Sequence, residues 1–127
     1  MTSPQAAPPN NPRSAFLKGA WEGVVDPDGA WLDAYAGAWP MNRAIAALLA
    51  AGVDRALLTA LVRTMQFELL MAVAQLLDDG QDRGHPDLRW RLFEIDAHGQ
   101  PLRPLLALHE SVLAADPTGQ ADREAWA

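Results

Sequence analysis

Cysteine is absent from this chain of 127 residues. The absence excludes a disulfide framework, thiolate metal sites and a thiol nucleophile, and it suits the cytosol. A chain of this length holds one domain and can bury about two-thirds of its unfolded surface. Its folding therefore needs neither a disulfide nor a metal, and we expect one small globular domain.

Basic side chains are fewer than acidic ones, with 10 Lys and Arg against 16 Asp and Glu and a formal net charge of −6. The basic residues do not gather on one predicted face. Nothing therefore offsets the repulsion between this chain and a phosphate backbone. We expect no nucleic-acid partner, and among proteins the charge favours a basic one.

A membrane-spanning run and a secretory signal are also missing. The N-terminus lacks a basic start followed by an apolar run. The most apolar stretch lies in residues 54–79, where Arg63, Gln66 and Glu68 interrupt it. Its unbroken part is well short of the about 20 residues that span a bilayer. We expect a soluble, cytoplasmic protein without a membrane partner.

Catalytic and cofactor motifs are absent as well. The sequence has no Gly-rich phosphate loop, no His-Glu-x-x-His, no Gly-x-Ser-x-Gly and no dinucleotide fingerprint. Its three histidines, His85, His98 and His109, have no chelating spacing. We therefore expect no cofactor, no metal and no covalent catalysis.

Residues 54–79 are the most informative segment, and their pattern predicts one long helix. Between residues 67 and 77 the only polar side chains are Glu68 and Gln75. A helix that is apolar on nearly every side is normally buried. We expect this helix to lie at the centre of the domain.

The first half of the long helix carries a polar sector. At 100° per residue, four polar side chains fall on one side: Arg55, Thr59, Arg63 and Gln66. We expect this side to face solvent.

A shorter helix is expected before it, with Asp26 as the N-cap and Pro27 at the first helical position. Pro40 would end this helix. Three aromatic side chains recur on it at i, i+4 and i+8: Trp31, Tyr35 and Trp39. One interpretation is an aromatic platform for a ligand or partner, and the other is a stripe that packs on the long helix as core.

A second short helix is expected over residues 41–51. Gly52 fits its C′ position, and Val53 can make the hydrophobic contact that accompanies such an end. Asp54 then caps the long helix. The two helices should form an αα-hairpin.

A small antiparallel hairpin should follow. Residues 88–95 alternate as a strand does, with a shift that a bulge near Leu92 would accommodate. Residues 96–99 form a turn ending in a glycine suited to positive φ. Residues 100–103 pair back, with Pro101 at an edge or at the first strand position.

From Pro104 the spacing becomes that of an amphipathic helix, which should end before Asp116. Five side chains line its apolar face: Leu105, Leu108, His109, Val112 and Leu113. We therefore expect a C-terminal helix with His109 turned inward.

Glu68 and His109 are the two weak catalytic candidates. A buried, unpaired carboxylate tends to take up a proton, and an inward-facing His109 could act with it as an acid–base pair. The alternatives are structural. Glu68 would pair with Arg89 or Arg91 or reach solvent. His109 would be hydrogen-bonded to backbone or to a carboxylate.

These patterns predict an α+β fold: three N-terminal helices around a long central apolar helix, a small antiparallel β-hairpin and a C-terminal helix. Residues 1–14 are expected to be a disordered arm. Residues 15–118 should form a single globular domain, and residues 119–127 a polar tail.

The expected function is that of a small acidic, bacterial-type protein-interaction domain without catalytic activity, such as an inhibitor, an immunity-like protein or an adaptor. Its partner would be another protein, of basic character, or a second copy of the chain. Four aromatic residues are the expected binding residues: Trp31, Tyr35, Trp39 and Trp90. The alternative is a small-molecule-binding domain or an acid–base enzyme with a pocket around Glu68 and His109.

Overall fold

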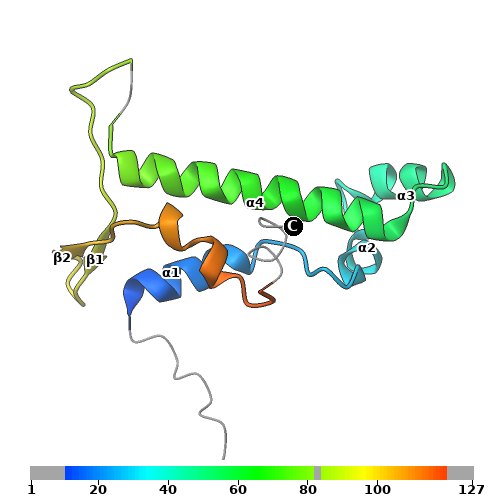
Figure 1. The fold of residues 1–127 in the computed structure, drawn as a ribbon, viewed down its shortest axis with the longest axis horizontal. Helices are drawn as coiled ribbons and strands as arrows, with labels where there is room; N and C mark the ends of the chain where they lie inside the picture. Colours follow the sequence, from blue (N-terminus) through cyan, green and yellow to red (C-terminus); the bar gives the residue numbers. More distant parts are fainter. Residues whose placement is uncertain (1–10, 82–83, 120–127) are drawn as a thin grey trace, which may run out of the picture. The chain divides into compact units, whose positions relative to one another are not determined.

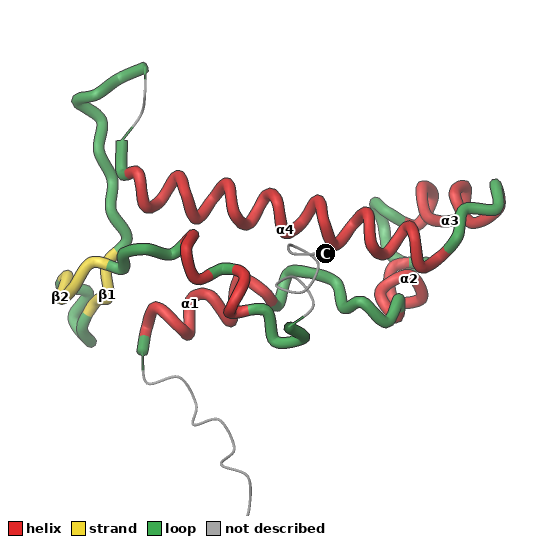
Figure 2. The backbone as a smooth tube through the Cα atoms, in the orientation of Figure 1, coloured by secondary structure: helices red, strands yellow, loops and turns green. Residues whose placement is uncertain are grey.

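A computed structural model describes residues 11–81 and 84–119 and has an α+β fold, as predicted (Figure 1). In chain order the elements are the helices α1 (Pro12–Trp21), α2 (Ala30–Tyr35), α3 (Asn42–Ala50) and α4 (Arg55–Asp79), the strands β1 (Phe93–Ile95) and β2 (Pro101–Pro104), and the 3-10 helices η1 (His109–Ser111) and η2 (Leu113–Ala115). Figure 2 shows the same chain coloured by secondary structure.

The chain divides into two compact units. Residues 22–68 hold α2, α3 and the first part of α4. The other unit combines α1 with the rest of α4 and all described residues after it. The helix α4 thus contributes to the interior of both units.

Helix α1 begins in the segment that we assigned to the N-terminal arm. The side chain of Asn11 accepts a hydrogen bond from the backbone N–H of Arg13 (2.9 Å), and Pro12 occupies the first helical position. This is a standard N-terminal cap. The rest of the predicted arm and nearly all of the predicted tail lie outside the described residues.

The unit of residues 22–68 has a small apolar core. Four buried side chains form it, and three partly buried ones pack against them: Trp31, Leu32, Ile45 and Leu58, with Val25, Leu49 and Val62. Each of the three helices of the unit supplies at least one of these residues. The burial of a few large side chains therefore fixes the packing of α2 and α3 on α4.

Helix α2 is shorter than predicted. Gly29 has φ +82°, a left-handed conformation, so the helix begins after it and not at Pro27. The side chain of Asp28, in place of Asp26, accepts a hydrogen bond from the backbone N–H of Ala30, the first residue of the helix (3.0 Å). The helix ends at Tyr35, which leaves Trp39 beyond it. The prediction of one continuous aromatic stripe on a helix is therefore wrong.

The α3–α4 connection is confirmed in detail. Gly52 has φ +86° and donates its N–H to the carbonyl of Leu49 (3.0 Å), while Val53 donates to the carbonyl of Leu48 (3.1 Å). This pair of bonds is a Schellman motif. The side chain of Asp54 then accepts a hydrogen bond from the backbone N–H of Leu57 (3.0 Å). Purely local chemistry sets this turn, which is why the sequence predicts it.

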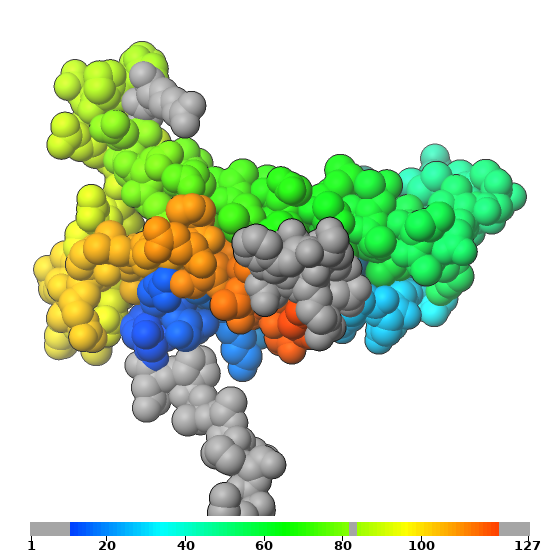
Figure 3. Space-filling view, viewed as in Figure 1, coloured from blue at the N-terminus to red at the C-terminus, as the bar shows by residue number. Residues whose placement is uncertain are grey.

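In the other unit, α1 packs against the segment that holds η1 and η2, which we call the 3-10 segment. Trp21 donates its indole N–H to the carbonyl of Val112 (2.8 Å), and Leu17, Leu108 and Val112 are buried. In Figures 1 and 3 the blue α1 and the orange residues that follow the hairpin lie side by side.

The antiparallel hairpin is present, with shorter strands than predicted. Residues 88–92 lie outside β1 and contribute an isolated bridge from Arg89 to Gln81. The bulge lies between Glu94 and Ile95, later than expected. Gly99 has φ +79° in the turn, and Pro101 is the first residue of β2, both as predicted.

The predicted C-terminal helix is wrong. Pro104 belongs to β2, and Ala107 has φ +55°, so a helix cannot run through these positions. Two short 3-10 helices take its place. The prediction that Leu108 and Val112 face inward is confirmed, because both side chains are fully buried.

The prediction that α4 is buried is also wrong. In the unit of residues 22–68 most of its polar sector faces inward, since Thr59 is 2% exposed and Arg63 is 4% exposed, whereas Arg55 is exposed. Thr59 accepts the indole N–H of Trp31 (2.9 Å). Arg63 donates to the carbonyl of Val25 (2.8 Å), whose N–H binds Gln66 (2.8 Å). The polar side of α4 is thus its anchored side.

We expect Thr59→Val to lower the free energy of unfolding by about 1–3 kcal/mol, because the buried indole N–H of Trp31 loses its acceptor. Urea denaturation followed by circular dichroism measures the change. Thr64→Val is the matched control, since Thr64 is exposed on the same helix and bonds the carbonyl of Ala60 (2.8 Å). Its effect should stay within about 0.5 kcal/mol. Equal effects would contradict the role of Thr59.

Candidate functional site

The apolar side of α4 is exposed. In the unit of residues 22–68, Leu57, Leu61 and Met65 are between 57% and 71% exposed. At 100° per residue they lie roughly opposite Thr59, Arg63 and Gln66 on the helix. Large apolar side chains therefore occupy the side that a soluble helix normally gives to polar residues.

In the other unit, Leu69, Val73 and Leu76 of α4 are between 44% and 65% exposed, whereas Ala74 is buried. In the unit of residues 22–68, a spacing of four residues puts Leu57, Leu61 and Met65 next to one another along the helix. We call the exposed side of α4 from Leu57 to Glu68 the α4 ridge, and its large apolar members are Leu57, Leu61 and Met65. Exposed apolar surface of this kind marks interaction sites.

One carboxylate lies within the ridge. Glu68 is exposed, and it follows Met65 by three residues and Leu61 by seven, which places it on the same side of the helix. The two basic residues of α4 are engaged elsewhere: Arg63 is buried, and Arg55 pairs with Asp33 (3.0 Å) near the helix start. Between Leu57 and Leu76 the exposed side of α4 therefore carries negative charge only.

By length and composition, α4 would suffice to cross a membrane. Its most apolar window is only 17% buried, unlike a core helix. Arg63 lies within that window and is turned into a packed unit, where it bonds the Val25 carbonyl. The described residues form a small domain of the soluble type.

The predicted aromatic binding residues do not form one surface. Trp31 is in the core and contacts Tyr35 edge to face, with 6.4 Å between ring centroids and 61° between ring planes. Trp39 is 86% exposed. Trp90 is partly buried, and its indole N–H binds the carbonyl of Leu76 (2.8 Å). Of the four, Trp39 offers the most accessible surface.

The structure pairs His109 with Asp78 and not with Glu68, the carboxylate of the acid–base hypothesis. Its Nδ1 lies 3.2 Å from Oδ2 of Asp78, whereas Glu68 is exposed. This agrees with the structural interpretation of His109, a histidine hydrogen-bonded to a carboxylate. The pairing of His109 with Glu68 as an acid–base couple has no support from these contacts.

Asp78 holds the start of the 3-10 segment. Its carboxylate accepts the backbone N–H groups of Leu108 (3.0 Å) and His109 (2.9 Å). Burial raises the pKa of Asp78, but the bonds from His109 and Leu108 outweigh it and hold the pKa below its ordinary value. The charged carboxylate is therefore the form that the fold stabilises.

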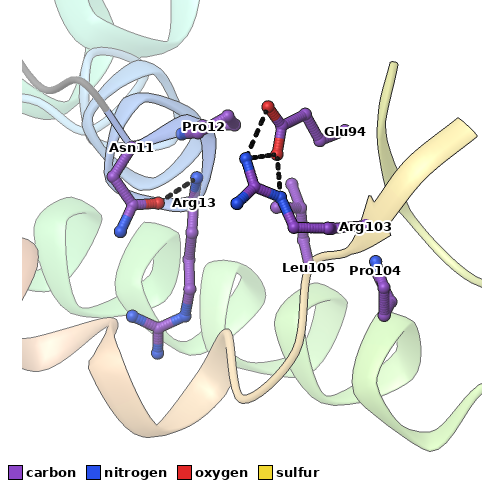
Figure 4. A pocket seen from close by; sticks show the side chains of 7 residues that line it. All are labelled: Asn11, Pro12, Arg13, Glu94, Arg103, Pro104 and Leu105. Carbon is purple, nitrogen blue, oxygen red and sulfur yellow. Dashed lines mark hydrogen bonds and ion pairs between the residues drawn. The ribbon is translucent and has the colours of Figure 1, made fainter. Parts of the chain in front are cut away.

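A hollow of about 380 Å³ lies beside the hairpin (Figure 4). Its lining consists of Asn11, Pro12, Arg13, Glu94, Arg103, Pro104 and Leu105. Arg103 binds Glu94 through two hydrogen bonds (3.0 and 3.1 Å). Arg13 extends away from Glu94 and donates to the carbonyl of Leu106 (2.8 Å). The charged groups of the hollow thus have partners within the protein.

A second hollow, of about 340 Å³, lies between α1 and η2. Neither Glu68 nor His109 lines either hollow. Within residues 11–81 and 84–119, no three His, Asp or Glu side chains gather closely enough to hold a metal ion.

Sequence reasoning missed Arg13 and Asp78. Arg13 donates to the carbonyls of Leu106 and Ala107 and to the hydroxyl of Ser111, so it ties α1 to the 3-10 segment. The Asn11-Pro12 pair, an N-cap followed by a proline, would have placed Arg13 on a helix. No comparable local signal exists for Asp78, because its partners lie about 30 residues away in the sequence.

Comparison with known proteins found no matching family model, no matching curated protein and no matching solved structure. The function must therefore be inferred from the residues of the chain itself.

We expect Asp78→Asn to destabilise the protein by about 1–2 kcal/mol near neutral pH, because charge-assisted bonds to two backbone N–H groups are weakened. The folded-state pKa of Asp78 is lowered, so its contribution is present above the ordinary pKa of an aspartate, about 3.9, and is lost as the pH falls through the lowered value. Unfolding midpoints measured across acidic pH test this.

Asp79→Asn is the control for that experiment, since Asp79 is exposed and its carboxylate binds Gln75 on the same helix (2.7 Å). Wild type and Asp79→Asn should lose stability along similar curves as the pH falls below about 4. Asp78→Asn should give a flatter curve. A curve as steep as that of wild type would show that Asp78 is not the group responsible.

Proposed function

We propose that this protein is a non-catalytic interaction domain that binds another protein through the α4 ridge. The observation that carries the proposal is the orientation of α4, with its polar side anchored and its apolar side exposed. Burying exposed apolar surface contributes roughly 25 cal/mol per Å² before the costs of association are subtracted. A ridge of large side chains can therefore drive binding.

Two further features support an interaction protein, and a third supports its location. The aromatic side chain of Trp39 is accessible, and such residues are enriched in interfaces. The net charge of −6 favours basic partners and would speed their association. The absence of cysteine fits a cytoplasmic location, where we place the protein. An inhibitor, immunity-like or adaptor role is consistent with these properties.

The enzyme alternative has less support. It requires Glu68 and His109 to share a pocket, whereas His109 is bonded to Asp78 and Glu68 is exposed. Neither residue lines either of the two hollows described above. We therefore retain the interaction role as the function that the site supports best.

Photo-crosslinking in the native host tests the proposal. With a genetically encoded benzophenone amino acid at position 65, we expect a discrete adduct of higher mass that mass spectrometry identifies as a protein. The matched position is Leu102 on β2, which is also exposed and apolar but outside the ridge. It should give no such adduct.

A second substitution completes the test. Leu61→Gln replaces one apolar side chain of the ridge with a polar one. Because the position is exposed, the free energy of unfolding should change by no more than about 0.5 kcal/mol. Combined with the crosslinker at position 65, it should reduce the adduct several-fold. Equal crosslinking from positions 65 and 102, or none from either, would refute the interaction role of the ridge.

A further inference from the structure

We infer that the partner of the α4 ridge is an amphipathic helix that carries Arg or Lys beside its apolar face. This inference rests on the proposed function and specifies the chemistry of the partner. It follows from the shape of the ridge and from the single charge within it.

The shape of the ridge favours a helix. Leu57, Leu61 and Met65 are each four residues apart, and such an i±4 row packs into the groove between rows of another helix. From Leu57 to Glu68 the ridge extends about 16 Å at 1.5 Å per residue. A partner helix of about 12 residues can cover it.

The charge of the ridge selects the partner. Covering Leu61 and Met65 brings the carboxylate of Glu68 into or beside the contact, because these three residues share one side of the helix. A carboxylate that loses water without gaining a cation costs free energy. The exposed side of α4 supplies no cation between Leu57 and Leu76. The partner must therefore supply it.

A second copy of this chain does not meet that requirement. In a parallel pair of α4 helices the two Glu68 carboxylates would face each other. In an antiparallel pair the ridge of the other copy would supply no cation to either Glu68. Facing like charges and carboxylates that lose water without a cation both disfavour association, whereas a basic helix turns the same carboxylate into an ion-pair partner.

A lipid surface is also disfavoured. A carboxylate in the hydrocarbon region of a membrane is costly, and the anionic lipids of a cytoplasmic leaflet would repel a chain of net charge −6. A basic amphipathic helix satisfies both the apolar and the charged part of the ridge.

Two labelled 20-residue peptides test the inference in fluorescence anisotropy titrations of the full chain. Both carry leucines at helical i, i+3, i+4 and i+7 spacing, and their flanking positions are Arg in one and Glu in the other. We expect the Arg peptide to bind and the Glu peptide to bind at least tenfold more weakly. Leu61→Gln combined with Met65→Gln should weaken binding of the Arg peptide at least tenfold.

The decisive variant is Glu68→Gln, which should weaken binding of the Arg peptide by about three- to tenfold through loss of the ion pair. Glu110→Gln removes the same charge from an exposed position in η1 and should change binding less than about twofold. Circular dichroism checks that each variant is folded. Equal losses in both variants, or no loss in Glu68→Gln, would overturn the inference.

Other outcomes identify other partners. A dimer in light scattering that Glu68→Gln strengthens would point to self-association and overturn the basic-helix partner. Binding to vesicles of phosphatidylcholine and phosphatidylglycerol, unaffected by Glu68→Gln, would point to a lipid surface and overturn it as well. A protein adduct at position 65 without binding of the Arg peptide would leave the interaction role standing and refute only this partner chemistry.

Discussion

The anchoring of residues 25 and 31 on the polar side of α4 decides which side of that helix remains available. Trp31 and Val25 bring an indole N–H, a backbone N–H and a carbonyl against the helix. Buried polar groups need partners, and an apolar helix face could supply none. Thr59, Arg63 and Gln66 supply them. Once these polar residues face inward, helix geometry turns the opposite side of α4, with Leu57 and Leu61, outward.

The same principle operates in the other unit. The segment after β2 is irregular, so its backbone groups lack regular partners. Asp78 binds two of its N–H groups, and Arg13 binds two of its carbonyls. In both units, polar side chains on helices therefore hold irregular segments in place. The units therefore hold together without the burial of Leu57, Leu61 and Met65, which remain exposed on α4.

The features that sequence predicts correctly depend on local chemistry. The turn at Gly52 and Asp54 is set by neighbouring residues, and so is the glycine in the hairpin turn. The orientation of α4 is not local, because the acceptor role of Thr59 becomes visible only when Trp31 lies against it. Likewise, the left-handed Ala107 that breaks the predicted C-terminal helix has no sequence signature, since alanine normally favours helix. Sequence reasoning missed the exposed ridge for the same reason that it missed the contact between Trp31 and Thr59. The two lie on opposite sides of one helix.

Glu68 gives the ridge selectivity that apolar residues alone lack. A row of leucines would accept any apolar surface, including a second copy of itself, because hydrophobic attraction is not directional. A carboxylate within the row penalises every occupant that cannot pair with it, so it acts against self-association and against lipid. A basic helix offsets part of this penalty, because its cation pairs with the carboxylate that has lost water. An unpaired carboxylate on an apolar face thus favours a partner that carries positive charge.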